Sequence, residues 1–261
     1  MTADAGMNAI VDALGLPPGA RVDARVPKKL LVEQGAPTPA DKRAIQDGID
    51  ELQWFAACKP ATIAVPAFSD DTREYLEIAV VGCAFRPDAH GKPAKATRLT
   101  ELIHRAIPYP VLLITADEND LAVSAAHKRR AQNEAGRTVI DRVVAATGLR
   151  LEPGDEAEAA FLKSLSLARQ PRADVYALYN GWLSRIEAIN AARLTGAFAA
   201  TDDARAIDRR RDALDAHARL AKEIDTLRAR AKREKQLSRR VDLNMEIQRR
   251  EAELSDYKKN L

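Results

Sequence analysis

The sequence predicts an α+β fold, with a mixed, mainly antiparallel sheet domain over residues 1–150 and an all-α helical-hairpin or arm region over residues 151–261. In the first half, short apolar and β-branched runs alternate with prolines, glycines and polar turns, as strands of a small sheet do. From residue 155 onward the chain contains one proline, Pro171, and two glycines, Gly181 and Gly196. Apolar residues there recur at helical spacing, which predicts helices.

The composition is that of a soluble chain with long solvated helices. The 261 residues allow one large or two small domains, and 30% of them are charged while 5% are aromatic. No window approaches the roughly 18 apolar residues of a membrane span, and the N-terminus lacks the features of a signal peptide. We therefore expect a cytoplasmic protein without membrane contact, in which Cys58 and Cys83 are buried small hydrophobes.

A short helix over 8–14 and a longer helix over 39–58 are predicted near the N-terminus, while residues 21–32 fit no single pattern. Thr38 offers a hydroxyl cap to the longer helix, and Pro39 suits its first turn. Apolar residues then follow at spacings of four, three and three, which predicts one buried helical stripe. These residues are Ile45, Ile49, Leu52 and Phe55.

The strands of the predicted sheet follow this helix. Residues 61–68 and 74–85 are expected to form an antiparallel pair, and a short helix over 99–106 ends before two prolines. Further strands are predicted over 111–115, 121–130 and 138–144. For the segment 121–130 a helix is the competing interpretation, because the segment is rich in alanine.

The second half predicts helices over 157–168, after Asp174, and from 201–203 onward. The heptad spacing of apolar residues fails where its next positions fall on Glu234 and Ser238, and apolar residues resume from Leu237 with a shifted phase. One regular dimeric coiled coil is therefore not expected. A helical hairpin or arm with a separate terminal amphipathic helix fits the pattern better.

Positive charge is concentrated in one segment. The chain has a formal net charge of +3, but residues 228–240 contain seven bases and one acid, Glu234. That segment therefore carries +6, and the rest of the chain sums to −3. A local concentration of this kind indicates contact with phosphate or with an acidic protein surface, although a solvated helix face is the simpler alternative.

Motifs for catalysis are missing or weak. The sequence has no phosphate-binding glycine loop and no histidine or cysteine pair at metal-ligand spacing, so we expect no catalytic residue, metal or cofactor. A metal-dependent nuclease is the sharper alternative, with Glu77 near Asp70 and Asp71 as metal ligands. Ala79, however, stands where such a site needs a lysine.

Two groups of residues are candidates for nucleic-acid contact. The first group lies in the sheet domain, where a solvated basic strand edge is the alternative interpretation. It comprises Lys28, Lys29, His127, Lys128 and Arg129. The second group lies in the helical region. It comprises Arg228, Arg230, Lys232, Arg233, Lys235, Arg239 and Arg240.

The terminal amphipathic helix is a candidate for binding a partner protein. An amphipathic helix can lay its apolar face into a groove of another protein, or pack back on the preceding helix of its own chain. The candidate partner-binding residues are Leu237, Val241, Leu243, Ile247 and Leu254.

Four short motifs give the sequence a family resemblance that covers nearly the whole chain. They are Val26-Pro27-Lys28-Lys29-Leu30, Ile107-Pro108-Tyr109-Pro110-Val111-Leu112-Leu113, Ala126-His127-Lys128-Arg129 and Tyr179-Asn180-Gly181-Trp182. The chain resembles an uncharacterised bacterial family, domain of unknown function 4391. The resemblance implies a setting beside DNA methyltransferases and helicases in restriction-like or phage-defence gene clusters. Its motifs have no established chemistry, so it assigns no catalytic residue.

Charge, motifs and resemblance together predict a non-enzymatic accessory subunit of such a defence system. Its partner would be a helicase or DNA methyltransferase subunit, and DNA contact is possible through the basic residues. A nuclease effector of the same system and a purely structural oligomerising protein are the alternatives. The sequence leaves the oligomeric state open.

Overall fold

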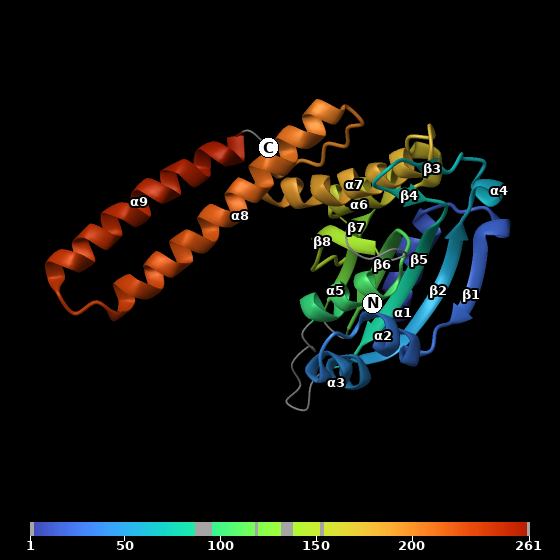
Figure 1. The fold of residues 1–261 in the computed structure, drawn as a ribbon. Coiled ribbons are helices and arrows are strands. Elements are labelled where there is room, and N and C mark those ends of the chain that lie inside the picture. The colour runs from blue at the N-terminus through green and yellow to red at the C-terminus, as the bar shows by residue number, and fades with distance from the viewer. Residues whose placement is uncertain (1–2, 87–95, 118–119, 132–137, 152–153, 260–261) are drawn as a thin grey trace. The chain divides into compact units, whose positions relative to one another are not determined.

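A computed structural model describes residues 3–86, 96–117, 120–131, 138–151 and 154–259. The chain has the predicted α+β class: a mixed sheet with helices around it, and helices alone in the C-terminal part (Figure 1). Its contacts divide it into two compact units, Met1–Ile186 and Glu187–Leu261. We call them the sheet unit and the helical unit.

The main sheet has six strands in the order β1-β2-β5-β6-β7-β8. They are β1 (Arg21–Arg25), β2 (Ile49–Cys58), β5 (Ile78–Phe85), β6 (Val111–Ala116), β7 (Leu121–Arg130) and β8 (Thr138–Ala146). Neighbouring strands run antiparallel except β5 and β6, which are parallel. The helix α5 (Ala96–Ala106) lies between those two strands in the chain, as a parallel connection requires. A separate two-stranded sheet pairs β3 (Phe68–Ser69) with β4 (Glu74–Tyr75).

One face of the main sheet packs against three helices, and this packing forms a continuous apolar core. The helices are α2 (Lys28–Gly35), α3 (Pro39–Gly48) and α5, and they contribute Leu31, Ile45 and Leu102. Strand residues of this core, such as Val81 and Leu113, alternate with neighbours that point to the other face. The helix α1 (Ala3–Ala13) contacts β5, β6 and β7, and the 3-10 turn Pro18–Ala20 leads into β1.

The predicted helix over 39–58 is correct only as far as Gly48. Thr38 caps α3 as expected, because its Oγ1 accepts from the Asp41 N–H at 3.1 Å. After Gly48 the chain becomes β2, which pairs with β1 on one side and β5 on the other. Pairing on both sides stabilises an extended segment whose apolar spacing also suited a helix.

The predicted strand over 61–68 is wrong over most of its length. The chain forms a short helix, α4 (Pro60–Ile63), in which the Thr62 hydroxyl accepts from the Lys59 N–H at 3.0 Å. Ala64 then takes a left-handed conformation with φ 53°. Only β3 at the end of the segment is extended, and β1 and α2 occupy the unassigned residues 21–32.

The other strand predictions are confirmed with small changes. The strand predicted over 74–85 divides into β4 and β5, and the later three correspond to β6, β7 and β8. The alanine-rich segment 121–130 is a strand, because it pairs with β6 on one side and β8 on the other. The short helix over 8–14 is α1, which begins earlier at Ala3, and Cys58 and Cys83 are buried and free as expected.

The first helices of the second half belong to the sheet unit. They are α6 (Glu156–Ser164), the 3-10 turn Leu167–Arg169 and the first turns of α7 (Val175–Thr195). Leu167 N–H donates to the Leu14 carbonyl at 2.8 Å, and Val175 N–H donates to the Pro66 carbonyl at 2.8 Å. These bonds join the first helices of the second half to the sheet, so the boundary between the two compact units lies after Ile186. The boundary predicted from the sequence, where the composition changes, lies near residue 150.

The helical unit contains the predicted hairpin, formed by α8 (Ala204–Arg233) and α9 (Leu237–Lys259) (Figure 1). Asp203 caps α8 by accepting from the Ala206 N–H at 3.1 Å. The buried hairpin core consists of Ile224, Ala231 and Ile247, with half-buried leucines around them. In the described residues no helix is both long and apolar enough to cross a membrane.

Candidate nucleic-acid interface

A β-bulge between β7 and β8 organises the polar site of the sheet unit. Ala126 pairs with Val143 and Lys128 pairs with Ile140, so two residues of β8 face the single residue His127. A bulge bends a strand and redirects its side chains, and bulges are common beside functional sites.

Two tyrosine hydroxyls bond to the β7 backbone on either side of His127. The Tyr179 hydroxyl accepts from the Ala126 N–H at 2.8 Å and lies 3.1 Å from the Ala126 carbonyl. The Tyr75 hydroxyl accepts from the Lys128 N–H at 3.1 Å. Both tyrosines are fully buried, and burial raises the pKa of each phenol. These neutral hydroxyls therefore fix the backbone beside the bulge.

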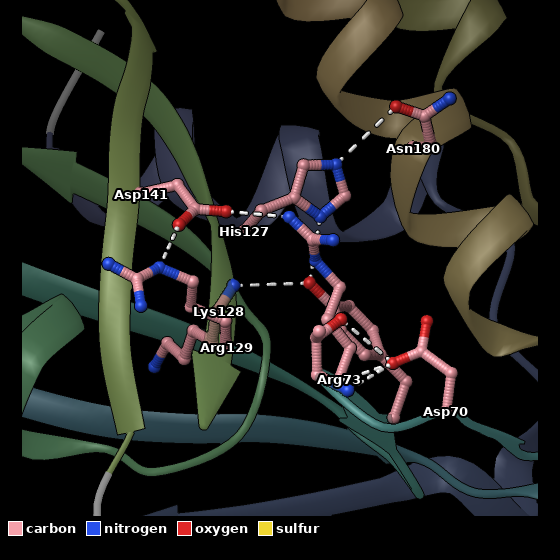
Figure 2. A network of polar contacts seen from close by, with 9 residues as sticks. Asp70, Arg73, His127, Lys128, Arg129, Asp141 and Asn180 are labelled. Atoms are coloured by element: carbon pink, nitrogen blue, oxygen red, sulfur yellow. Dashed lines mark hydrogen bonds and ion pairs between the residues drawn. The ribbon is translucent and has the colours of Figure 1, made fainter. Parts of the chain in front are cut away.

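His127 lies between β7 and α7, and Figure 2 shows its ring pointing toward Asn180. Its Nε2 is 3.4 Å from the Asn180 Oδ1, and its Nδ1 is 2.7 Å from the Tyr75 hydroxyl. An amide oxygen only accepts, so Nε2 donates to it. The half-buried ring also contacts Tyr176 at 5.1 Å between centroids.

Next to His127, one carboxylate is shared by two arginines (Figure 2). Asp141 on β8 accepts from Arg73 at 2.8 Å and from Arg129 at 3.0 Å. Asp70 in turn accepts from the backbone N–H of Arg73 at 2.6 Å, which fixes the turn that carries this arginine. Asp70 and Asp141 thus set two carboxylates beside the two guanidinium groups, and the cluster is close to charge balance.

Lys128 does not have the placement expected of a phosphate ligand. Only 3% of the residue is exposed, and its ammonium donates to the Ile107 carbonyl. Burial lowers the pKa of Lys128 to about 7. Strand alternation directs Lys128 into the core, whereas its neighbours His127 and Arg129 are partly exposed.

The two lysines of α2 also differ from each other. Lys28 donates to the Ile49 carbonyl at 2.8 Å and so ties α2 to the beginning of β2. Lys29 has a side chain that is 82% exposed and pairs with Glu33 at 3.5 Å. Within the first candidate group, Lys29 and Arg129 thus keep charged groups at the surface, and Lys28 has a structural role.

A groove adjoins Arg129 and Leu30, and we call it the α2 groove. Its volume is about 1100 Å³. Its walls come from α2, from residues 105–109 at the end of α5 and just after it, from β2 and β5, and from the paired ends of β7 and β8. Trp54 and Tyr109 line it, with ring centroids 5.7 Å apart.

The acids proposed for a nuclease site are used for other contacts. Glu77 pairs with Lys59 at 3.4 Å, and Asp70 caps its own turn through Thr72 and Arg73. Across the residues that the structure describes, no group of three or more His, Cys, Asp or Glu side chains could hold a metal ion.

In the helical unit, six exposed bases surround the turn between α8 and α9, and we call them the basic tip. Among the described residues, none of the six forms an ion pair. They are Arg230, Lys232, Arg233, Lys235, Arg239 and Arg240. The seventh predicted base, Arg228, pairs with Glu251 at 2.7 Å and with Asp225 at 3.7 Å. Arg228 is therefore already neutralised within the hairpin.

The candidate partner-binding residues lie on two different faces of α9. Ile247 is buried in the hairpin core, and Leu243 and Leu254 pack against that core. Leu237 is 66% exposed and Val241 is 48% exposed. Met245, which is 65% exposed, extends this exposed stripe at the same spacing of four, and the sequence analysis did not single it out.

The comparison with known families matches residues 14–254 to one described as Domain of unknown function (DUF4391). The chain belongs to the DUF4391 family. No curated protein and no solved structure was found to match it. The DUF4391 match spans the main sheet and most of the helical hairpin.

The four motifs that suggested the DUF4391 family meet in the sheet unit. Leu30, Tyr109 and Arg129, from three of them, line the α2 groove. Tyr179 and Asn180, from the fourth, bond to the His127 segment. Tyr75 and Tyr176 complete this site, and neither had a sequence signal, since they are far from His127 along the chain.

Proposed function

We propose that this DUF4391 protein is a cytoplasmic, non-enzymatic accessory subunit of a DNA-modification or restriction-like defence system. Its hairpin contacts nucleic-acid phosphates through the basic tip. The observation that carries the proposal is the set of six exposed bases without ion pairs around one turn. Such a group loses no existing salt bridge when it meets a phosphate backbone.

The position of the tip favours backbone contact rather than base reading. The bases come from the end of α8, the turn and the beginning of α9, so they are not arranged along one helix. Recognition of a major groove usually presents a single helix or a two-stranded ribbon. Contacts to phosphate instead need positively charged side chains that are long enough to touch the nucleic-acid backbone, and such contacts carry little sequence preference.

The exposed stripe of Leu237, Val241 and Met245 supports the second part of the proposal, which is a protein partner. An apolar stripe at this spacing can occupy a groove on another protein. The family resemblance suggests a helicase or DNA methyltransferase subunit as that partner. Leu237→Ser with Met245→Ser should abolish co-purification with such a subunit and leave the DNA affinity of the isolated chain unchanged.

Charge reversal at the tip tests the phosphate contact. We expect Arg239→Glu with Arg240→Glu to weaken binding of a labelled duplex at least tenfold at low salt, because two attractive contacts become repulsive. Fluorescence anisotropy over a salt series measures this. If all six bases engage, the wild-type slope of log K against log salt should approach about −5, and the variant slope should be smaller by about 2.

The matched control is Arg205→Glu with Arg209→Glu. Both positions are exposed on the same hairpin outside the tip, and the change in net charge is identical. The control should bind DNA much better than the tip variant. Equal loss in the two variants, or binding that does not respond to salt, would contradict the proposal.

A further inference from the structure

Bases on one face of α8 form a straight row that extends away from the basic tip. All are exposed, and together with Thr226 they follow one another at spacings of three, four, four and three residues, which places them on one face of the helix. They are Arg219, Lys222, Arg230 and Arg233, and we call them the α8 row. At the rise of an α-helix the row is about 21 Å long. Arg230 and Arg233 belong to the tip, so the row continues the tip along the hairpin.

The acids of the hairpin pair between its two helices and leave the α8 row without partners. Glu223 stands four residues after Arg219, a spacing that suits an ion pair within one helix. Glu223 instead pairs with Arg250 of α9 at 4.0 Å, and Arg250 also pairs with Glu246 at 3.0 Å. Among the described residues, no member of the row forms an ion pair. The charge of the row is therefore available to an external anion.

A groove of about 400 Å³ lies beside the row, and residues of both α8 and α9 line it. Three bases of the row line its α8 side, and Arg250 with its two partner acids lines the rest, together with Thr226 and Leu227. Because Arg250 is shared by the two acids, the positive charge that remains uncompensated lies on the α8 side. This distribution favours an extended anion that follows α8.

The surroundings of the row favour the phosphate backbone of a duplex as that anion. Among the described residues that line the groove, none is aromatic, so the groove has no ring on which an unpaired base can stack. Two packed helices are about 20 Å across, whereas the major groove is about 12 Å wide, so the hairpin does not enter it as a single helix does. A duplex carries one phosphate charge per about 1.7 Å of its axis, and several phosphates can therefore meet one row.

We infer that a DNA duplex lies along the flank of the hairpin, with its phosphate backbone on the α8 row as well as on the basic tip. This inference rests on the proposed phosphate contact and deepens it, because it adds Arg219 and Lys222 and sets the direction of the duplex. A duplex that meets the hairpin end-on touches the six bases of the tip. A duplex along α8 touches these six and the two further bases of the row.

The salt dependence of binding distinguishes the two arrangements. Fluorescence anisotropy of a labelled duplex with the full-length chain should give a slope of log K against log salt of about −7 for eight engaged bases, against about −5 for the tip alone. Arg219→Gln with Lys222→Gln should weaken binding at least about fivefold at low salt and return the slope to about −5. The matched control, Arg205→Gln with Arg209→Gln, removes the same charge from exposed positions of α8 outside the row. It should bind the duplex like the wild type.

A variant that gains affinity complements this test, because a folding defect does not produce a gain. Thr226 is exposed, its hydroxyl donates to the Lys222 carbonyl of its own helix, and it is the one uncharged position within the row. Thr226→Arg should strengthen duplex binding at least about twofold and make the slope steeper by about 1. Gln248→Arg adds the same charge on α9. Gln248 is exposed and two residues from both Glu246 and Arg250, so it points away from the groove and the affinity should stay near that of the wild type.

Three outcomes would overturn the inference. The first is wild-type duplex affinity in both Arg219→Gln with Lys222→Gln and Thr226→Arg, with a wild-type slope near −5. The second is tighter binding of an oligothymidylate than of a duplex of equal charge, which would assign the row to a single strand. The third is binding of polyglutamate that the row variant loses while its duplex affinity stays unchanged, which would assign the row to an acidic protein. In the first and third cases, duplex binding that the tip variant loses would still support the proposed function.

Discussion

The sheet unit and the α8–α9 hairpin differ in how many of their side chains are buried. The sheet unit buries large side chains completely, including Trp182, Tyr179 and Phe161. In the described part of the hairpin, the buried apolar cluster contains Ile224, Ala231 and Ile247. The first region gains most of its stability from burial, whereas the second presents most of its surface to solvent. We therefore expect the two regions to respond to mutation separately.

The largest effect is expected from Trp182→Ala in the sheet unit. Trp182 is fully buried, and its indole N–H donates to the Leu165 carbonyl at 2.8 Å. Removing the ring leaves a cavity and an unsatisfied carbonyl, so the free energy of unfolding should fall by about 3–5 kcal/mol. Urea denaturation followed by fluorescence measures this. A loss below about 1 kcal/mol would show that the contrast between the two regions is smaller than their burial indicates.

Ile247→Ala should have a smaller and local effect. Ile247 belongs to the few buried residues of the hairpin, and we expect its truncation to cost about 1–2 kcal/mol, below the usual range for a full core. Hydrogen exchange should accelerate in α8 and α9, while amides of β5 and β6 stay protected. Uniform acceleration throughout the chain would mean that the two regions unfold as one.

A further difference concerns the pH dependence of the sheet unit. Burial lowers the pKa of His104 to about 3, and its Nε2 lies 3.0 Å from the Ser124 hydroxyl. Between pH 6.5 and 3 the unfolded chain holds one more proton than the folded chain at this site. Stability should therefore fall on acidification by up to about 1.4 kcal/mol per pH unit.

His104→Gln should remove this part of the pH dependence. Denaturation at pH 7 and pH 5 compares the two proteins. The wild type should lose more stability than the variant between the two pH values. Equal losses would show that His104 does not control the acid response of the sheet unit.

The sequence identified the fold class and most later elements, because their patterns agree with the structure that forms. The prediction from the sequence was wrong over the second half of residues 39–58, where the spacing of apolar residues suits both a helix and a strand. The deciding contacts come from β1 and β5, which are distant in sequence. Gly48 marks the change from helix to strand, and nothing else in the local pattern does so.

The candidate residues show the same limit. Strand alternation could have separated Lys128 from His127 and Arg129, because successive side chains point to opposite faces. No local rule could have predicted that Tyr75 and Tyr176 would surround His127. In the hairpin, a spacing of four from Leu237 through Val241 does indicate Met245, so that part of the stripe was available from sequence.

The three-residue connection between α8 and α9 has a consequence for how the hairpin behaves when it is unliganded. Bases in the last turn of α8 lie at the negative end of that helix dipole, which is favourable. Arg239 and Arg240 lie at the positive end of α9, whose first turn has no acid. The hairpin therefore retains internal repulsion, which the phosphate contact proposed above would relieve.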